Sequence, residues 1–237
     1  MLKISNGEIS FKETLLLKNI NFEINPAELV VIIGPNGTGK TSLLNVMSGT
    51  IKLTRGTLLN KFKKHILIPQ NLYYPEDVTL FEYISSVFYR EKFKWFLSKD
   101  DVDRVFFVLD KLHLTKKQEF TLNKLSAGEL QLANIALCLI SEADFILLDE
   151  PTSNLDLVNQ IMILNMIKEL TNQDISVVAV LHDINLAARY GDEFILVSRN
   201  SSLIKGDKSQ VLTCKNLSDA YNIDFKELGL YGQINIK

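Results

Sequence analysis

One short segment of this 237-residue chain constrains its fold more than any other. Residues 34–41 read Gly-Pro-Asn-Gly-Thr-Gly-Lys-Thr and fit the pattern G-x-x-x-x-G-K-[ST]. The segment follows an apolar run, Leu29 to Ile33, and precedes a helical run that begins at Ser42. A strand, a glycine-rich loop and a helix in this order direct backbone N–H groups and the positive end of a helix dipole toward an anion. The sequence therefore predicts an α/β core with a phosphate-binding loop.

The residue types of this loop suit a nucleoside triphosphate. Lys40 is expected to reach the β- and γ-phosphates, and the Thr41 hydroxyl is placed to ligate Mg²⁺. The loop alone leaves kinases, GTPases, helicases and transport ATPases open. The residues expected to contact the nucleotide here are Gly34, Pro35, Asn36, Gly37, Thr38, Gly39, Lys40, Thr41 and Ser42.

The apolar runs predict a parallel sheet preceded by antiparallel strands. Runs at Leu29 to Ile33, Phe145 to Leu148, Val177 to Leu181 and Phe194 to Val197 are continuous, as in strands covered on both faces. Residues 2–11 alternate around Asn6-Gly7, a pair that favours a tight hairpin turn. The fold class is therefore α/β, with a parallel sheet and an N-terminal antiparallel β subdomain.

Helix-spaced apolar residues predict an inserted helical subdomain at about 76–142, with Asp100 and Asp101 capping its second helix. We expect one domain over 1–237, whose core comprises about 1–75 and 143–237.

Composition limits the possible partners. The chain has 46% hydrophobic residues and a formal net charge of -2, which indicates a folded protein without an overall attraction to nucleic acid or anionic lipid. Its apolar runs are shorter than the roughly 20 residues that span a bilayer. We expect a cytoplasmic protein that does not bind nucleic acid and that reaches a membrane only through a partner.

Two carboxylates end the apolar run Phe145 to Leu148. The C-terminal edge of a parallel sheet is where ligands bind, so Asp149 and Glu150 are expected beside the phosphate loop. Asp149 is the expected Mg²⁺-positioning residue. Glu150 is suited to orient and deprotonate the attacking water.

At this point the sequence resembles the ATP-binding cassette (ABC) family of P-loop NTPases. Leu125-Ser126-Ala127-Gly128-Glu129 stands shortly before the acidic strand, where the family has its LSGGQ signature. The likeness extends along essentially the whole chain. Gln70 resembles the Q-loop glutamine, Asp156 lies in a segment like the D-loop, and His182 follows a strand like the switch histidine.

The resemblance implies a role for each of these residues. Gln70 would contact the magnesium and the water, His182 would donate a hydrogen bond to the γ-phosphate, and Phe11 would stack on adenine. Ser126, Ala127, Gly128 and Glu129 would meet ATP held by a second copy of the chain, with Asp156 near the interface. ATP hydrolysis would then require a homodimer.

Two departures from the family pattern stand in the signature region. Ala127 replaces the second signature glycine and adds a methyl group where backbone and phosphate approach closely, which predicts lower activity. The helix from Leu130 lacks the basic residues commonly found there, which predicts that a supporting ion pair is missing. Both departures are interpreted as tuning, because Lys40, Asp149, Glu150 and His182 remain.

The C-terminal third resembles the importer ATPases for iron-siderophore, haem and cobalamin, through His182 to Tyr190 and Leu217 to Tyr221. That likeness implies transmembrane permease subunits as partners, an indirect link to a solute-binding protein, and a location on the cytoplasmic face of the membrane. In that group the segment Asn71 to Leu97 receives a helix of the permease. Its aromatic residues would form the cleft for that helix, and core packing explains many of them equally well. They are Tyr73, Tyr74, Phe88, Tyr89, Phe93, Trp95 and Phe96. An ATPase for another cargo, or a soluble ABC ATPase in assembly or regulation, stays open.

Overall fold

The computed structural model describes residues 1–70, 72–92 and 96–225, apart from the side chains of residues 90–92. The predicted permease-contacting residues Phe93 and Trp95 lie outside the described residues. The chain forms two compact units, and each is described by itself. The first unit comprises Met1–Pro69, Asp144–Pro151 and Ile167–Lys237, and the second comprises Gln70–Ala143 and Thr152–Met166. The second unit thus begins at Gln70, earlier than the expected 76, and includes a segment that follows the acidic strand.

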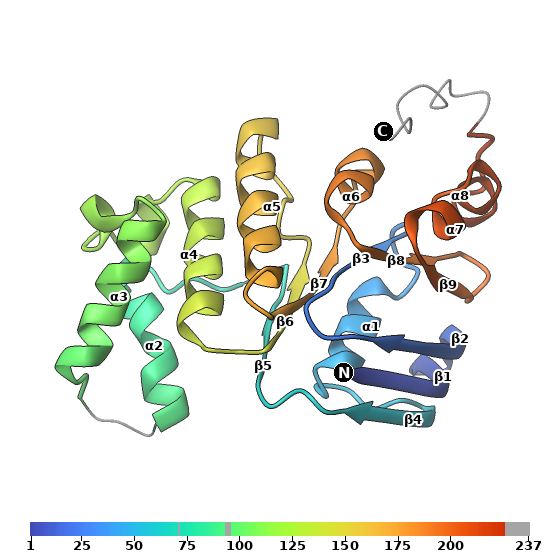
Figure 1. Cartoon of the computed structure of the whole chain (residues 1–237), viewed down its shortest axis with the longest axis horizontal. Coiled ribbons are helices and arrows are strands. Elements are labelled where there is room, and N and C mark those ends of the chain that lie inside the picture. Colours follow the sequence, from blue (N-terminus) through green and yellow to red (C-terminus); the bar gives the residue numbers. More distant parts are fainter. Residues whose placement is uncertain (71, 93–95, 226–237) are drawn as a thin grey trace. The chain divides into compact units, whose positions relative to one another are not determined.

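The bounds of the helices and strands are as follows (Figure 1). The strands are β1 (Leu2–Phe11), β2 (Thr14–Ile24), β3 (Leu29–Ile33), β4 (Arg55–Asn60), β5 (His65–Ile68), β6 (Phe145–Asp149), β7 (Ser176–Val180), β8 (Glu193–Val197) and β9 (Leu203–Gly206). The helices are α1 (Lys40–Met47), α2 (Leu80–Lys92), α3 (Lys99–Lys111), α4 (Ala127–Ile140), α5 (Leu157–Thr171), α6 (Ile184–Tyr190), α7 (Lys208–Val211) and α8 (Cys214–Tyr221), with 3₁₀ turns η1 (Thr115–Lys117) and η2 (Leu122–Lys124).

Two sheets make up the first unit. One has the strand order β2-β1-β4 and is antiparallel, and the other has the order β5-β6-β7-β3-β8-β9, parallel except for β9. Every residue of β3, β6 and β7 is buried, which explains their continuous apolar sequences. Helix α1 contacts strands of both sheets. The carboxyl ends of β3, β6 and β7 therefore lie at one edge, beside the start of α1.

One turn was wrongly predicted from the sequence. Asn6 and Gly7 lie within a continuous β1, where Asn6 has a φ of 50° and the register with β2 shifts. A Cβ atom at Gly7 would lie 2.6 Å from Ile4 Cγ2, so glycine permits close packing at this bulge. The hairpin turn falls instead at Lys12-Glu13, between Phe11 and Thr14.

Helices α2, α3 and α4 pack against one another in the second unit. The cap of α3 is Ser98, not the predicted Asp100 or Asp101: the Ser98 hydroxyl accepts from the Asp101 N–H, and the Asp101 carboxylate accepts from the Ser98 N–H. None of the helices in the described parts of the chain is long and apolar enough to cross a membrane.

Candidate functional site

The phosphate loop joins β3 to α1 in a conformation that requires glycine. Gly34 has a φ of 146°, and a Cβ atom there would lie 2.2 Å from the Val197 carbonyl oxygen of β8. Gly39 has a left-handed conformation at the N-cap of α1, and it has no side chain to occupy the N–H groups of the first helical turn. The loop therefore presents backbone donors at a helix N-terminus, the arrangement that suits a phosphate.

Lys40 is buried inside the curve of this loop. Its ammonium group donates hydrogen bonds to the Gly34 and Pro35 carbonyl oxygens, both at 2.8 Å. Burial lowers the pKa of Lys40, and the carboxylates of Glu150 and Asp149 oppose that shift. A buried cation of this kind is suited to bind the anionic oxygens of a triphosphate.

Asp149, at the end of β6, is joined to the start of α1. The Thr41 hydroxyl donates to Asp149 Oδ2 at 2.9 Å, while the buried Oδ1 atom has no hydrogen-bond partner among the described residues. Burial raises the pKa of Asp149, and the bond from Thr41 opposes that shift. A hydroxyl beside an unpartnered carboxylate oxygen fits the oxygen donors that Mg²⁺ prefers. The described residues contain no group of three acidic, histidine or cysteine side chains that could hold a metal ion.

Glu150 and His182 meet at the carboxyl ends of two neighbouring strands. Strands β6 and β7 are parallel, with Asp149 opposite Val180, so Glu150 and His182 follow them at the same edge. His182 Nε2 lies 2.6 Å from Glu150 Oε1, and the Glu150 side chain is only 15% exposed. Glu150 has a φ of 54°, a strained value for this residue type. The structure thus brings together Lys40, Thr41, Asp149, Glu150 and His182.

The other predicted residues of the first unit lie near the loop or at its surface. Phe11 is exposed at the end of β1, and Lys12 Nζ lies 5.8 Å from its ring centroid. Strand β2 of the same hairpin approaches the loop, because a Cβ atom at Gly39 would lie 3.4 Å from Leu16 and Leu17. Gln70 lies two residues after the end of β5, is exposed, and belongs to the second unit.

The signature segment forms the N-terminus of α4 in the second unit. Ser126 is the N-cap in a capping box with Glu129, and Ser126 and Ala127 are exposed. A Cβ atom at Gly128 would lie 3.2 Å from the Asn159 side chain, and the Asn159 N–H donates to the Asp156 carboxylate at 2.8 Å. Asn159 therefore packs between the signature segment and Asp156.

Sequence reasoning missed a residue beside the signature segment. The Lys117 ammonium group of η1 forms an ion pair with the Glu129 carboxylate, and this bond is the largest cause that lowers the pKa of Glu129. The helix segment from Leu130 to Asn134 contains no basic residue, and the ion pair found here joins Glu129 to a lysine outside the helix. The spacing of residues along a helix could not have indicated this ion pair, since Lys117 lies in η1 and Glu129 lies in α4.

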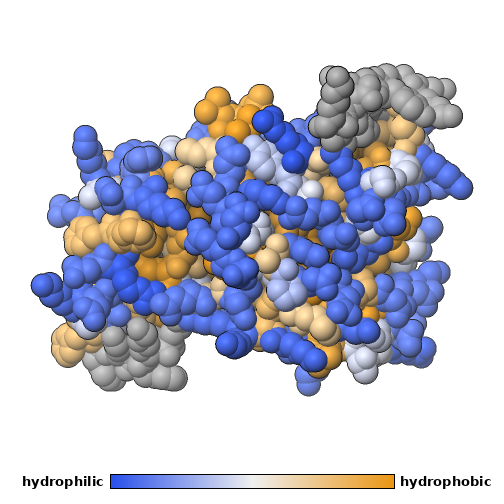
Figure 2. Space-filling view, in the orientation of Figure 1, coloured by the Kyte–Doolittle hydropathy of each residue, from blue (hydrophilic) through white to orange (hydrophobic). Residues whose placement is uncertain are grey.

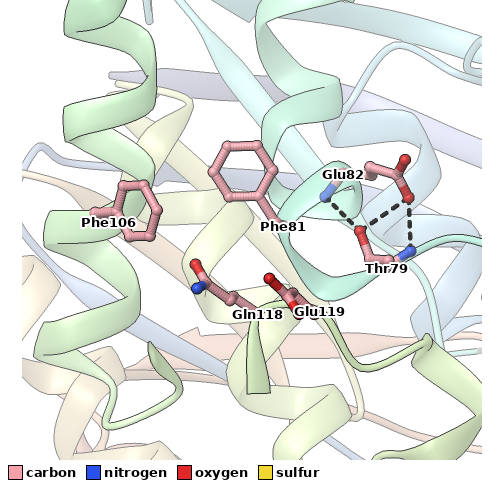
Figure 3. Close-up of a pocket in the computed structure, with 6 residues that line it drawn as sticks. All are labelled: Thr79, Phe81, Glu82, Phe106, Gln118 and Glu119. Carbon is pink, nitrogen blue, oxygen red and sulfur yellow. Dashed lines mark hydrogen bonds between the residues drawn. The ribbon is translucent and has the colours of Figure 1, made fainter. Parts of the chain in front are cut away.

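A small cavity of about 320 Å³ opens in the second unit (Figure 3). The Phe81 and Phe106 rings border it, with centroids 5.7 Å apart, and Glu82 and Glu119 contribute carboxylates. Thr79 and Gln118 complete its lining. Its lining therefore combines two aromatic rings with two acidic residues, and the Glu82 carboxylate accepts hydrogen bonds from the Thr79 N–H and hydroxyl, both at 2.8 Å.

Comparison with known proteins agrees with this geometry. The family profile described as ABC transporter matches residues 17–153. An uncharacterised ABC transporter ATP-binding protein of Methanocaldococcus jannaschii is 34% identical, over 94% of this chain and 92% of its own length. A hemin import ATP-binding protein of Pseudoalteromonas translucida is 32% identical, over 94% of this chain and 93% of its own length.

Two solved structures are also similar. One, assigned to a metal-chelate type ABC transporter in an inward-facing conformation, has a TM-score of 0.87 and 26% identity, over 94% of this chain and 89% of that chain. The other, a dimeric ATP-binding cassette in a post-hydrolysis state with ADP and phosphate, has a TM-score of 0.76 and 25% identity, over 87% of this chain and 98% of that chain. The expected α/β cassette fold is thereby confirmed, and the chain belongs to the ABC transporter family as an ATP-binding cassette ATPase.

Proposed function

We propose that this chain is the ATP-hydrolysing subunit of an ABC importer, with iron-siderophore, haem or cobalamin as its cargo. The observation that carries the proposal is the set of five side chains at the edge of the parallel sheet: Lys40, Thr41, Asp149, Glu150 and His182. The similarity to a hemin import ATP-binding protein supports the importer class and the cargo. In the proposal, residues 1–237 act as one cassette domain.

In the phosphate-loop half of the ATP site, Lys40 binds the β- and γ-phosphates together with the loop residues from Gly34 to Ser42. The pKa of Lys40 is lowered because its ammonium group is removed from water. A bound phosphate anion would stabilise this ammonium group in place of the lost water. Phe11, exposed at the tip of the β1–β2 hairpin, offers a flat ring for adenine. These contacts hold the triphosphate before any reaction.

Thr41 and Asp149, with Gln70, would hold Mg²⁺. Bound there, Mg²⁺ would supply positive charge that offsets the negative charge developing on the phosphates during phosphoryl transfer. The unpartnered oxygen of Asp149 supports this assignment. The chain itself contributes the hydroxyl of the exposed Thr41 and the carboxylate of the buried Asp149.

Glu150 is proposed to orient and deprotonate the water that attacks the γ-phosphate. His182 Nε2 lies 2.6 Å from Glu150 Oε1, and His182 is proposed to donate its hydrogen bond to the γ-phosphate when ATP is bound. The attacking water loses one proton to Glu150 and its oxygen forms a bond to the γ-phosphorus, while the bond from the γ-phosphorus to the β–γ bridging oxygen breaks, which yields ADP and inorganic phosphate.

A second copy of the chain is the proposed partner that completes the site. Ser126, Ala127, Gly128 and Glu129 begin a 14-residue helix whose first N–H groups suit a phosphate. Directly after Asp156, Leu157 and Val158 are 61% and 77% exposed, and burial of this apolar surface favours association. The similarity to a dimeric cassette bound to ADP and phosphate supports a homodimer.

The cavity of the second unit is the proposed docking surface for the permease on the cytoplasmic face of the membrane. An amphipathic helix with an apolar and a basic side chain would match its phenylalanine rings and its carboxylates, Glu82 and Glu119. Figure 2 shows one face, which is mainly hydrophilic with separate hydrophobic patches. Exposed apolar patches can mark sites where a partner binds. A solute-binding protein would act on the permease rather than on this chain.

Purification from the native membrane tests the proposal. We expect the chain to be isolated with two permease subunits and to hydrolyse ATP, with the hydrolysis rate raised by a cargo-loaded binding protein in reconstituted vesicles. Isolation with a soluble scaffold and without a permease would instead identify an assembly or regulatory ATPase. Loss of the permease after Phe106→Asp, with retained ATP affinity, would support the cavity as the docking surface.

A further inference from the structure

The ion pair between Lys117 and Glu129 lies at the N-terminus of α4. Glu129 Oε1 contacts Lys117 Nζ, and Glu129 Oε2 accepts a hydrogen bond from the Ser126 N–H at 2.9 Å. The two side chains are 36% and 24% exposed. Both oxygens of Glu129 therefore have partners, one cationic and one in the signature backbone.

The acid at position 129 creates an electrostatic problem. The signature pattern LSGGQ has a neutral glutamine where this chain has Glu129. A carboxylate in the first turn stabilises the helix but repels an approaching phosphate. Residues 127–140 contain no Lys, Arg or His, so the helix itself supplies no compensating charge.

Backbone hydrogen bonds fix the position of Lys117. The Lys117 N–H donates to the Leu114 carbonyl at 2.9 Å, and the segment that follows is bonded to the start of α2. There the Phe81 N–H donates to the Gln118 carbonyl at 3.0 Å, and the Leu80 N–H donates to the Phe120 carbonyl at 2.9 Å. Lys117 thus joins α4 to the segment that lines the cavity of the second unit.

We propose that Lys117 is a positioning residue for ATP-dependent closure, because it neutralises Glu129 and so lets the signature N-terminus of one copy accept the triphosphate held by the other. The inference rests on the proposed function, in which the two copies share each ATP. The pair does not touch the reacting atoms. Its effect falls on the ATP concentration that closes the dimer and not on the affinity of a single copy for ATP.

The test measures ATP-driven dimerisation by size-exclusion chromatography with light scattering, in a Glu150→Gln background. Lys117→Met leaves Glu129 uncompensated and is expected to raise the ATP concentration at half-dimerisation about fivefold. Glu129→Gln leaves Lys117 as a net positive charge and is expected to lower it about threefold. In the variant with both substitutions, the ATP concentration at half-dimerisation should return close to that of the Glu150→Gln parent. Lys117→Arg, which keeps the positive charge, should have the same value as the parent.

Lys116→Met is the matched control, because Lys116 is an exposed neighbour without an ion pair among the described residues. It is expected to leave dimerisation unchanged. Fluorescent-nucleotide binding to the monomer and the thermal midpoint of each variant report on ATP affinity and on folding.

The sign of the Glu129→Gln effect decides the outcome. If Lys117 only tethers η1 to α4, Glu129→Gln breaks the tether, weakens dimerisation as Lys117→Met does, and the double variant does not recover. That result, or an unchanged midpoint in Lys117→Met, would overturn the inference. A Glu150→Gln parent that binds ATP and stays monomeric would contradict the proposed shared site itself, whatever Lys117 does.

Discussion

The phosphate-loop region and the signature region differ in how their side chains are held. In the first, Lys40 and Asp149 are 6% and 5% exposed, and Thr41 and His182 are bonded to the carboxylates at the strand ends. In the second, Ser126 and Ala127 are exposed at a helix N-terminus, and Ser126 and Glu129 form a capping box, with Glu129 also paired with Lys117. One region is a network of buried charges, and the other is a capped and exposed helix end.

This difference indicates what each region needs from ATP. Burial disfavours the charged forms of Lys40 and Asp149, as the directions of their pKa shifts show. A ligand that supplies charges of opposite sign would therefore stabilise these two side chains. An exposed helix end gains little alone and is useful when another surface brings an anion to it. Substitutions in the first region should therefore alter binding and chemistry within one copy, whereas those in the second should alter association.

The largest expected effect is on chemistry in the phosphate-loop region. Glu150→Gln removes the water-activating carboxylate and retains the phosphate contacts, so turnover should fall by about 10²- to 10⁴-fold while ATP still binds. ATPase assays and light scattering would show an ATP-bound dimer that accumulates. The exposed Glu13→Gln is a control with the same chemical change. Wild-type turnover in Glu150→Gln would remove Glu150 from its proposed role.

Lys40→Ala should weaken the binding of ATP to the phosphate loop. The variant loses charge-assisted hydrogen bonds to the phosphates, each worth about 1.5–3 kcal/mol, so ATP affinity should fall about ten- to 150-fold. Equilibrium binding of a fluorescent ATP analogue measures this loss. Lys18→Ala, on the exposed face of β2, is the control. Undiminished affinity in Lys40→Ala would contradict the assignment of the phosphate loop.

The phosphate-loop region was well predicted from the sequence because its residues adjoin strands of high apolar content. The run Leu29 to Ile33 fixes β3, and the following loop and helix are then placed by chain continuity. Asp149 and Glu150 end a second buried strand, and parallel order brings the strand ends to one edge. The local sequence pattern and the right-handed connection of α/β units were sufficient to predict where these residues lie.

The remaining features depend on contacts between elements distant in the sequence. The pair of Lys117 with Glu129 joins a 3₁₀ turn to a helix, and neither residue stands out by spacing. At Asn6-Gly7 the turn propensity is genuine, but packing of Gly7 against Ile4 makes a bulge in one long strand. Ser98 outcompetes Asp100 as the α3 cap because its hydroxyl completes a capping box.

Ser126→Ala tests whether the signature region acts in association. It removes the N-cap of α4, which costs about 1 kcal/mol, and should lower turnover about tenfold without weakening ATP binding to the monomer. Ser98→Ala is a matched control, because Ser98 caps α3 through a capping box of the same kind. Both variants should lose similar stability, and only Ser126→Ala should lose turnover. Equal losses of turnover would mean that the cap of α4 acts through stability alone.

Asp149→Asn should show that charge burial in the phosphate-loop region costs stability. Burial raises the pKa of Asp149 above its ordinary value of 3.8, so the native state binds the proton more tightly than the unfolded state does. The stability from this site is present below pH 3.8 and is lost as pH rises through the native pKa. The variant should therefore melt about 2–4 °C higher near pH 7, if about 1 kcal/mol is recovered, with a smaller difference near pH 4. A melting temperature lowered at pH 7 would contradict this account.

The smallest effect is expected at Ala127, the first residue of α4. Its methyl group is exposed at the helix end to which the phosphate of the other copy is proposed to bind. Ala127→Gly should raise turnover about twofold, and Ala127→Val should lower it about threefold, because close approach of the phosphate depends on side-chain size. Steady-state ATPase assays measure the turnover of both variants and of the parent, which should fall in the order glycine, alanine, valine at position 127. If glycine and valine both lower turnover, the methyl group serves the helix and does not obstruct the phosphate, since glycine and valine are both poorer helix formers than alanine.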